Sequence, residues 1–249
     1  MGQTGGGIVS LEGAEPGSCA EPAGAASAPA PGRFLVLEGI DGCGKSTQLE
    51  QLRTWLPASG LMPAGAKLLL TREPGGTELG QALRQLLLHP PGEAAPGSTA
   101  ELLLYAADRA QHVQQRIEPA LAAGHWVLSD RYCGSTAAYQ GYGRGLPLPL
   151  IEQLAAIATG GLQPDLTLLL ELPLAEALRR RQQRPADRIE ASGEAFLQRV
   201  SDGFAALAQQ PGWCRIPADQ PLEAVTAAIQ AALTRHCDLP AGGGVCSDG

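Results

Sequence analysis

The sequence predicts an α/β fold in which a five-stranded parallel sheet is covered on both faces by helices. Short apolar runs recur along the chain, and longer stretches rich in Ala, Leu, Gln and Arg separate them. Strands that alternate with helices are typical of parallel βαβ units. The runs are apolar at consecutive positions, which is typical of strands buried on both faces.

Five strands and seven helices follow from this pattern. The expected strands are 34–37, 67–70, 126–129, 166–170 and, more weakly, 213–216. The expected helices are 47–56, 78–88, 100–121, 149–159, 173–184, 193–209 and 222–236. Ligands of such sheets bind at the carboxyl ends of the strands, so functional residues are expected there.

Composition excludes several classes of protein. A net charge of -7 argues against a general nucleic-acid binder, which needs clustered positive charge. The longest apolar runs fall well short of the roughly 20 residues of a membrane-spanning helix. The six cysteines lack the spacing of a zinc site or a disulfide framework, which favours reduced thiols. We therefore expect a cytoplasmic protein with neither a nucleic-acid nor a membrane partner.

Both ends of the chain differ in composition from the middle. Residues 1–32 are rich in Gly, Ala, Pro and Ser and resemble neither a secretory signal nor a transit peptide. We expect them to form a disordered extension, or to result from an upstream start codon. One folded domain is predicted over residues 33–238, because a chain of this length can share one core, followed by a flexible tail at 239–249.

A phosphate-binding loop follows the first predicted strand. The segment GIDGCGKST matches G-x-x-x-x-G-K-[ST] between a strand and a helix. Its glycines allow backbone N–H groups to face phosphate oxygens, and the helix that follows adds the positive end of its dipole. The motif predicts nucleotide binding without naming the reaction. It consists of Gly39, Ile40, Asp41, Gly42, Cys43, Gly44, Lys45, Ser46 and Thr47.

Charged residues at two other strand ends fit a phosphorylated ligand. Arg72 follows the second strand and offers a planar fork for two phosphate oxygens, although a surface ion pair with Glu73 is an equal alternative. Asp130 follows the third strand like the acidic residue that holds Mg²⁺ in P-loop enzymes. Arg131 beside it offers a second phosphate contact. A purely structural Asp–Arg pair is the alternative.

Two further segments are candidates for the site. Three glycines surround Arg144 in 141–145, which predicts a mobile lid over about residues 140–149 that brings a cation to the transferring group. A flexible surface loop is the alternative. Tyr105 and Arg109 lie four residues apart on a predicted helix and share one face, where they could contact a base. A core position for the aromatic ring is the alternative.

Together these motifs resemble bacterial thymidylate kinase from about residue 33 to residue 234. The matching segments are GIDGCGKST, TREPGGT, LLLYAADRAQH, DRYCGSTAAYQG and YGRG, of which TREPGG and DRYCGSTAAYQG are the most specific. The resemblance implies the P-loop nucleoside monophosphate kinase fold, phosphorylation of dTMP by ATP with Mg²⁺ in dTTP synthesis, and a homodimer.

The resemblance also implies roles for individual residues at the phosphates. Asp41 would lie toward the 3′-hydroxyl side of the deoxyribose, and Arg72 and Arg131 would hold the acceptor phosphate. Ser46 and Asp130 would lie at Mg²⁺, with Asp130 also near the transferred group.

At the base, Tyr105 stands where the family has a stacking aromatic residue, usually Phe. Arg109 would hydrogen-bond the base, and Thr136 and Gln140 would line the thymidine pocket.

One departure concerns the transferring cation. Some family members carry an arginine directly after the carboxylate of the phosphate loop, where this sequence has Gly42. The other known arrangement supplies the arginine from the lid, so the sequence resembles the lid-arginine type. The predicted catalytic set is therefore Lys45, Asp130 and Arg144. The stretch 89–98, rich in Pro and Gly, has no predicted role.

Two other functions remain as alternatives at this point. The first is a kinase for another nucleoside monophosphate or for a deoxynucleoside. The second is a non-catalytic P-loop switch, although the N-K-x-D signature of guanine recognition is absent from the sequence.

Overall fold

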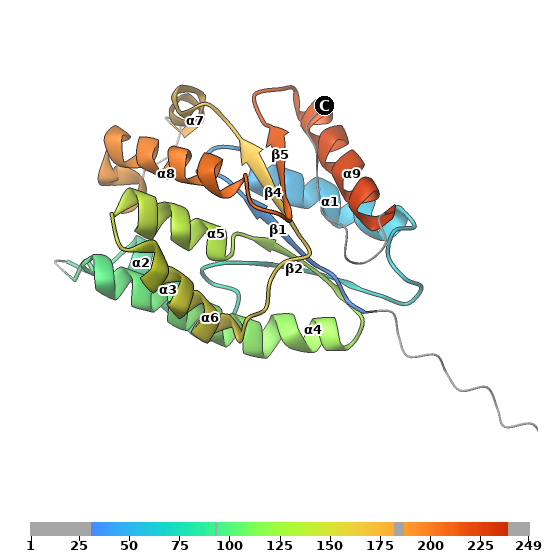
Figure 1. Cartoon of the computed structure of the whole chain (residues 1–249), viewed down its shortest axis with the longest axis horizontal. Coiled ribbons are helices and arrows are strands. Elements are labelled where there is room, and N and C mark those ends of the chain that lie inside the picture. Colours follow the sequence, from blue (N-terminus) through green and yellow to red (C-terminus); the bar gives the residue numbers. More distant parts are fainter. Residues whose placement is uncertain (1–30, 93, 182–186, 239–249) are drawn as a thin grey trace, which may run out of the picture.

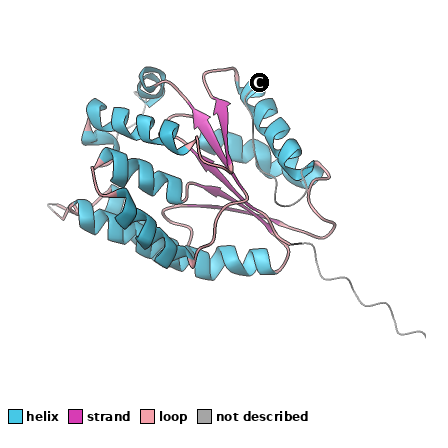
Figure 2. Ribbon diagram, in the orientation of Figure 1, coloured by secondary structure: helices cyan, strands magenta, loops and turns pink. Residues whose placement is uncertain are grey.

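A computed structural model describes residues 31–92, 94–181 and 187–238. The tail predicted at 239–249 and all but two residues of the predicted extension lie outside these ranges, so both stay predictions. A central sheet forms the middle layer, with helices on both of its faces (Figures 1 and 2). None of the helices within the described ranges is long and apolar enough to cross a membrane.

The sheet confirms the prediction of five parallel strands. Their order is β2-β3-β1-β4-β5, and every neighbouring pair is parallel. The central strand therefore has β3 on one side and β4 on the other, which creates a switch point for ligand binding at its carboxyl end. The strands are β1 (Phe34–Glu38), β2 (Leu68–Arg72), β3 (Trp126–Asp130), β4 (Leu166–Glu171) and β5 (Trp213–Pro217).

Successive residues of β1 point to opposite faces of the sheet, and both faces are buried. Leu35 and Leu37 belong to the larger of two apolar clusters, whereas Phe34 and Val36 belong to the smaller one. All four side chains are at most 1% exposed. This confirms the prediction that β1 is apolar at consecutive positions because helices cover both faces of the sheet.

The helical segments include the predicted ones, with differences in two regions, and the short segments 133–136 and 190–192 were not predicted. They are α1 (Lys45–Ala58), α2 (Glu78–Leu88), α3 (Ser98–His112), η1 (Val113–Ile117), α4 (Glu118–Ala122), α5 (Cys133–Thr136), η2 (Ala137–Gly143), α6 (Leu148–Thr159), α7 (Leu174–Arg181), η3 (Glu190–Ser192), α8 (Glu194–Leu207) and α9 (Leu222–Asp238). The helix expected to reach residue 184 is described only to Arg181.

The first difference lies in the long helix predicted at 100–121. It divides into α3, the π-helical turn η1 and α4, with Pro119 at the start of α4. Proline has no backbone N–H and cannot donate to the carbonyl four residues earlier, so the regular pattern of hydrogen bonds changes just before it.

The second difference lies in the mobile lid predicted over about 140–149: part of it is helical, and its mobility stays a prediction. Residues 137–143 form the π-helix η2, whose Ala138, Tyr139 and Gln140 are buried, and only 144–147 connect it to α6. A Cβ atom at Gly143 would lie 2.6 Å from Phe196 of α8. This glycine therefore serves close packing of η2 on α8, and it does not mark an open loop as the sequence had suggested.

Candidate active site

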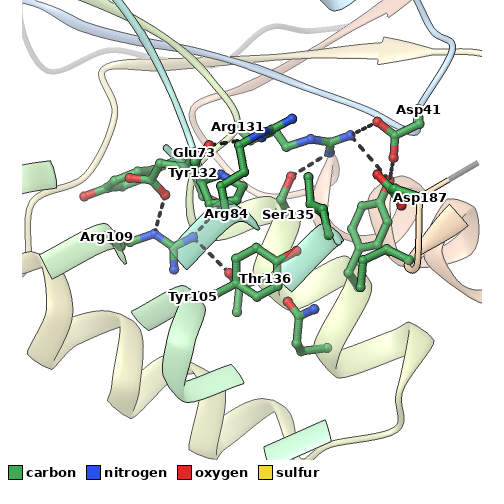
Figure 3. Close-up of a pocket in the computed structure, with 15 residues that line it drawn as sticks. Asp41, Glu73, Arg84, Tyr105, Arg109, Arg131, Tyr132, Ser135, Thr136 and Asp187 are labelled. Atoms are coloured by element: carbon green, nitrogen blue, oxygen red, sulfur yellow. Dashed lines mark hydrogen bonds and ion pairs between the residues drawn. The ribbon is translucent and has the colours of Figure 1, made fainter. Parts of the chain in front are cut away.

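A pocket opens at the carboxyl edge of the sheet, beside the phosphate loop. Its walls come from segments far apart in the sequence that the parallel strands bring to one edge (Figure 3). The polar and charged side chains that line it include Asp41, Glu73, Arg84, Tyr105, Arg109, Arg131, Ser135, Thr136, Tyr139, Gln140 and Asp187. Asp41, Tyr105, Arg109, Arg131, Thr136 and Gln140 are thus brought together as predicted for an acceptor pocket.

The phosphate loop joins β1 to α1. Lys45 is the first residue of α1 and is buried, with its Nζ atom 2.9 Å from the carbonyl oxygen of Gly39 and 3.3 Å from that of Ile40. The lysine is therefore held across its own loop at the amino end of the helix, where N–H groups and the helix dipole favour an anion. This arrangement suits a nucleotide's phosphates.

Arg131 forms the centre of the pocket wall on the loop side. Its backbone has a φ of 74°, an unusual value for a residue other than glycine, directly after β3. The guanidinium group donates from Nη2 to Oδ1 of Asp41 at 2.6 Å and from Nη1 to Oγ of Ser135 at 2.8 Å (Figure 3). It also donates to the carbonyl oxygen of Gly39 at 3.0 Å. These bonds fix one cation beside the phosphate loop.

Asp41 is the partner of that cation. Burial favours the neutral acid, but Arg131 and Lys45 outweigh it and hold the pKa of the Asp41 carboxyl well below its ordinary value. The hydroxyl of Tyr139 donates to its second oxygen at 2.9 Å. Asp41 is therefore a fixed carboxylate within reach of a ligand in the pocket.

The opposite end of the pocket is suited to a planar base. Arg109 donates from Nε to Glu73 at 2.8 Å and from Nη2 to Oγ1 of Thr136 at 2.9 Å (Figure 3). Its Nη1 group makes no hydrogen bond with the described residues, so it is the donor left for a ligand. Tyr105 lies one helical turn earlier on α3 and also lines the pocket. The predicted pair therefore shares one helix face and one cavity.

Gln140 presents its amide at the same end of the pocket. Its Nε2 group donates to Oε1 of Glu101 at 2.8 Å. Because the amide nitrogen is used in this bond, the carbonyl oxygen is the atom left to accept a hydrogen bond from a ligand.

A second cavity of about 400 Å³ adjoins the other side of the β3 end. Ser46, Arg72 and Asp130 line it together, whereas Arg131 lines the first pocket. Arg72 also lies near Arg84 of the first pocket, because both side chains approach Gly75. One carboxylate oxygen of Asp130 is buried without a hydrogen-bond partner among the described residues. A hydroxyl and an unpaired carboxylate oxygen fit Mg²⁺, which binds few protein groups and completes its shell with phosphates and water.

Arg144 lies away from both cavities. It donates from Nε and Nη2 to the buried Glu101, at 3.3 and 3.2 Å, and its guanidinium carbon is 4.5 Å from the ring centre of Phe196. The structure therefore does not bring Arg144 to the phosphate loop, where the sequence had placed it.

Several pocket residues were missed by sequence reasoning. Arg84 of α2 donates to the carbonyl oxygen of Pro74 at 3.0 Å, and Asp187 follows the segment 182–186. Tyr139 contacts both Asp41 and Arg131 through its hydroxyl. Tyr139 lies within the DRYCGSTAAYQG motif, so the motif could have identified it. Arg84 and Asp187 lie outside every motif recognised in the sequence.

Comparison with known proteins identifies the family. The family model described as thymidylate kinase matches residues 37–229, a span that contains every residue lining the two cavities. The chain belongs to the thymidylate kinase family. The resemblance inferred from the motifs is thereby confirmed.

Individual members of the thymidylate kinase family support this assignment over most of the chain. A thymidylate kinase of Synechococcus sp. (strain RCC307) is 71% identical over 208 residues, covering 84% of this chain and 98% of that protein. One from Parasynechococcus marenigrum (strain WH8102) is 67% identical, covering 81% and 97%. The crystal structure of thymidylate kinase from Ehrlichia chaffeensis has a TM-score of 0.66 at 32% identity and covers 82% of this chain and all of that one.

Proposed function

We infer that this protein transfers the γ-phosphoryl group of ATP to dTMP, which gives ADP and dTDP on the route to dTTP. The observation that carries this inference is the pocket beside the phosphate loop, in a chain 71% identical to a thymidylate kinase of Synechococcus sp. (strain RCC307). The two cavities divide the task. One suits the acceptor nucleotide, and the other suits the metal and the phosphates of the donor.

The base end of the pocket supports a thymine-like acceptor. A thymine edge offers a carbonyl oxygen at position 4 and an N–H donor at position 3. Nη1 of Arg109 can donate to the first, and the carbonyl oxygen of Gln140 can accept from the second. Cytosine reverses both groups and would leave both protein groups unpaired. The ring of Tyr105 is available to stack on the base.

Catalysis requires positioning and charge neutralisation more than proton transfer. A phosphate oxygen of dTMP is already anionic near pH 7, so the attack needs no strong general base. Arg131, fixed by Asp41 and Ser135, would hold the acceptor phosphate in line, and Lys45 would neutralise charge on the transferred group. Arg72 stays a proposed phosphate ligand that reaches the acceptor from the second cavity.

We also propose Mg²⁺ as the metal of this reaction. Ser46 and Asp130 would hold it, with further positions filled by phosphate oxygens and water. When bound, Mg²⁺ neutralises charge on the donor phosphates.

The proposed role of Arg144 as the transferring cation stays a prediction from the sequence. Its bonds to Glu101 favour a positioning role, and the charge neutralisation described above therefore relies on Lys45 and Arg131.

A homodimer in the cytoplasm is part of the proposal. Large apolar side chains are exposed on α3 and on α2 and α6, which both pack against α3. Their exposure is 49% for Leu79, 51% for Leu103, 40% for Leu150 and 79% for Ile157. Apolar surface of this kind is typical of an interface between subunits. A cytoplasmic location agrees with the absence of disulfides among the described cysteines.

A direct test measures ADP and dTDP formation by the purified protein with ATP, Mg²⁺ and dTMP. We expect turnover of about 1 to 100 per second, as for other kinases. Lys45→Met should lower kcat by about 10³-fold or more, because it removes charge neutralisation that acts in the transition state. Full activity in Lys45→Met, or no dTDP from the wild-type protein, would contradict the proposal.

A further inference from the structure

A buried carboxylate on α3 stands behind the base end of the acceptor pocket. Glu101 is 0% exposed and lies outside the pocket lining. It accepts hydrogen bonds from three side chains of two separate segments. Gln140 lies in η2 and Arg144 directly follows it, whereas Arg188 comes from the described segment that begins at residue 187. A fully buried carboxylate is retained at a cost unless its oxygens are paired. These three donors pair both of its oxygens.

The bond to Gln140 has a consequence for recognition. An amide side chain can present either its NH₂ group or its carbonyl oxygen to a ligand, and its neighbours decide which. The carboxylate of Glu101, paired with two guanidinium groups, can only accept hydrogen bonds. It therefore takes the NH₂ group of Gln140 at 2.8 Å and leaves the carbonyl oxygen for the pocket.

The two arginines tie this carboxylate to different segments of the chain. Arg188 donates to Glu101 and also to the carbonyl oxygen of Leu87 at 2.8 Å, and its neighbours Asp187 and Ile189 line the pocket. Arg144 stacks on Phe196 while it bonds Glu101. The carboxylate of Glu101 is thus paired with two guanidinium groups that do not line the pocket.

We propose that Glu101 is a specificity-determining positioning residue: by accepting the NH₂ group of Gln140, it fixes the carbonyl oxygen of Gln140 as the acceptor for an N–H group of a thymine-like base. The inference rests on the proposed function and deepens it. A base with an acceptor at the same ring position, such as cytosine, meets an oxygen that cannot donate and is rejected.

The test is the ratio of kcat/KM for dTMP to kcat/KM for dCMP. Glu101→Gln has nearly the same shape but can donate as well as accept, so the amide of Gln140 can turn and offer its NH₂ group to cytosine. We expect the ratio to fall about tenfold or more. In a Gln140→Leu background, Glu101→Gln should not change the ratio further, because the two residues act as one unit.

A matched control is Glu176→Gln, which also removes a carboxylate paired with two arginines, on α7 and outside both cavities. It should leave the ratio unchanged. If Glu101→Gln does not fold, Gln140→Leu is a second test variant, because it leaves the ion pairs of Glu101 with its two arginines in place. It should lower the ratio by at least as much. A wild-type ratio in either variant would overturn the inference.

Failure of the role proposed for Glu101 can be distinguished from failure of the proposed function. Failure of the wild-type protein to phosphorylate dTMP would refute the proposed function before any ratio is compared. An active wild-type protein whose Glu101→Gln variant keeps the wild-type ratio would refute only the role of Glu101.

Discussion

At the scale of single residues, the carboxylate of Asp41 and the guanidinium of Arg131 form the end of the pocket beside the phosphate loop. Each is held by other groups before any ligand binds, Asp41 by Tyr139 and Arg131 by Ser135 and the phosphate loop. Such preorganisation reduces the free energy that a ligand must spend on ordering the site.

Asp41→Asn tests this pair. The amide keeps the size of the side chain but removes the charge that fixes Arg131 at 2.6 Å. We expect kcat/KM for dTMP to fall about 10- to 100-fold while the KM for ATP changes little, because a charged partner of a partly buried arginine is lost. Steady-state kinetics with each substrate varied in turn would show this. An unchanged kcat/KM would mean that Asp41 does not organise the acceptor site.

Arg144→Ala separates two roles for that arginine. If Arg144 positions Glu101, the dTMP-to-dCMP ratio falls while kcat for dTMP stays within about threefold, and this is the result that we expect from its contacts. A transition-state cation would instead lower kcat by about 10³-fold or more. That outcome would restore the role predicted from the sequence.

Asp108 makes the free energy of unfolding depend on pH. Burial and then the charge of Glu73 raise the pKa of Asp108 to about 6 from 3.8, and one of its oxygens has no hydrogen-bond partner among the described residues. Between about pH 4 and pH 6 the folded protein keeps a proton on Asp108 that the unfolded chain has released. The free energy of unfolding therefore falls as pH rises through this range, and the loss is complete above about pH 6.

Asp108→Asn removes this penalty and keeps an oxygen for the backbone N–H of Gly75. We expect the variant to exceed the wild-type free energy of unfolding by on the order of 1 kcal/mol or more at pH 8, with the difference vanishing toward pH 4. Urea unfolding at several pH values would measure it. A difference independent of pH would refute the explanation.

At the scale of elements, η2 and α8 approach closely through glycines. A Cβ atom at Gly203 would lie 2.7 Å from the ring of Tyr142, and one at Gly143 would lie 2.6 Å from Phe196. This contact orients η2, which carries both Tyr139 and Gln140 into the acceptor pocket.

Gly203→Ala should destabilise the protein by about 1–3 kcal/mol, because the added methyl group overpacks a close helix contact. Thermal and urea unfolding would measure the loss. The matched control is Gly97→Ala before α3, where a Cβ atom meets no other atom within 4 Å and φ is -67°. Equal stability of both variants would show that the contact is not close in solution.

The same elements show what the sequence could predict. Strands such as β1 were predictable, because burial on both faces requires apolar residues at every position. The phosphate loop and Arg131 were predictable, because each directly follows a predicted strand, and parallel strands bring their carboxyl ends to one edge of the sheet. The helical state of 137–143 was not predictable. Its glycines are typical of a loop, and their role in packing depends on α8, a helix that lies much later in the sequence. Nor was the pairing of Arg144 with Glu101 predictable, because it depends on tertiary contact alone.

At the scale of the whole molecule, the exposed apolar side chains of α2, α3 and α6 predict self-association. Ile157→Glu places a charge at the most exposed of them, which would be desolvated in a dimer. We expect the wild-type protein to sediment as a dimer of about 51 kDa, twice the mass of one chain, and the variant as a monomer of 25.7 kDa. Leu222→Glu on α9, where Leu222 is 42% exposed, is the matched control and should remain dimeric. A monomeric wild-type protein would contradict the proposed interface.

In the proposed function the whole molecule selects one acceptor: the pocket would recognise the base, and ATP held by the phosphate loop would supply the phosphoryl group. The most direct test is a competition in which equimolar dTMP, dUMP, dCMP, dGMP and thymidine share one reaction with ATP and Mg²⁺. The account predicts that dTDP forms first and in excess over every other product. Faster phosphorylation of any other acceptor would contradict it.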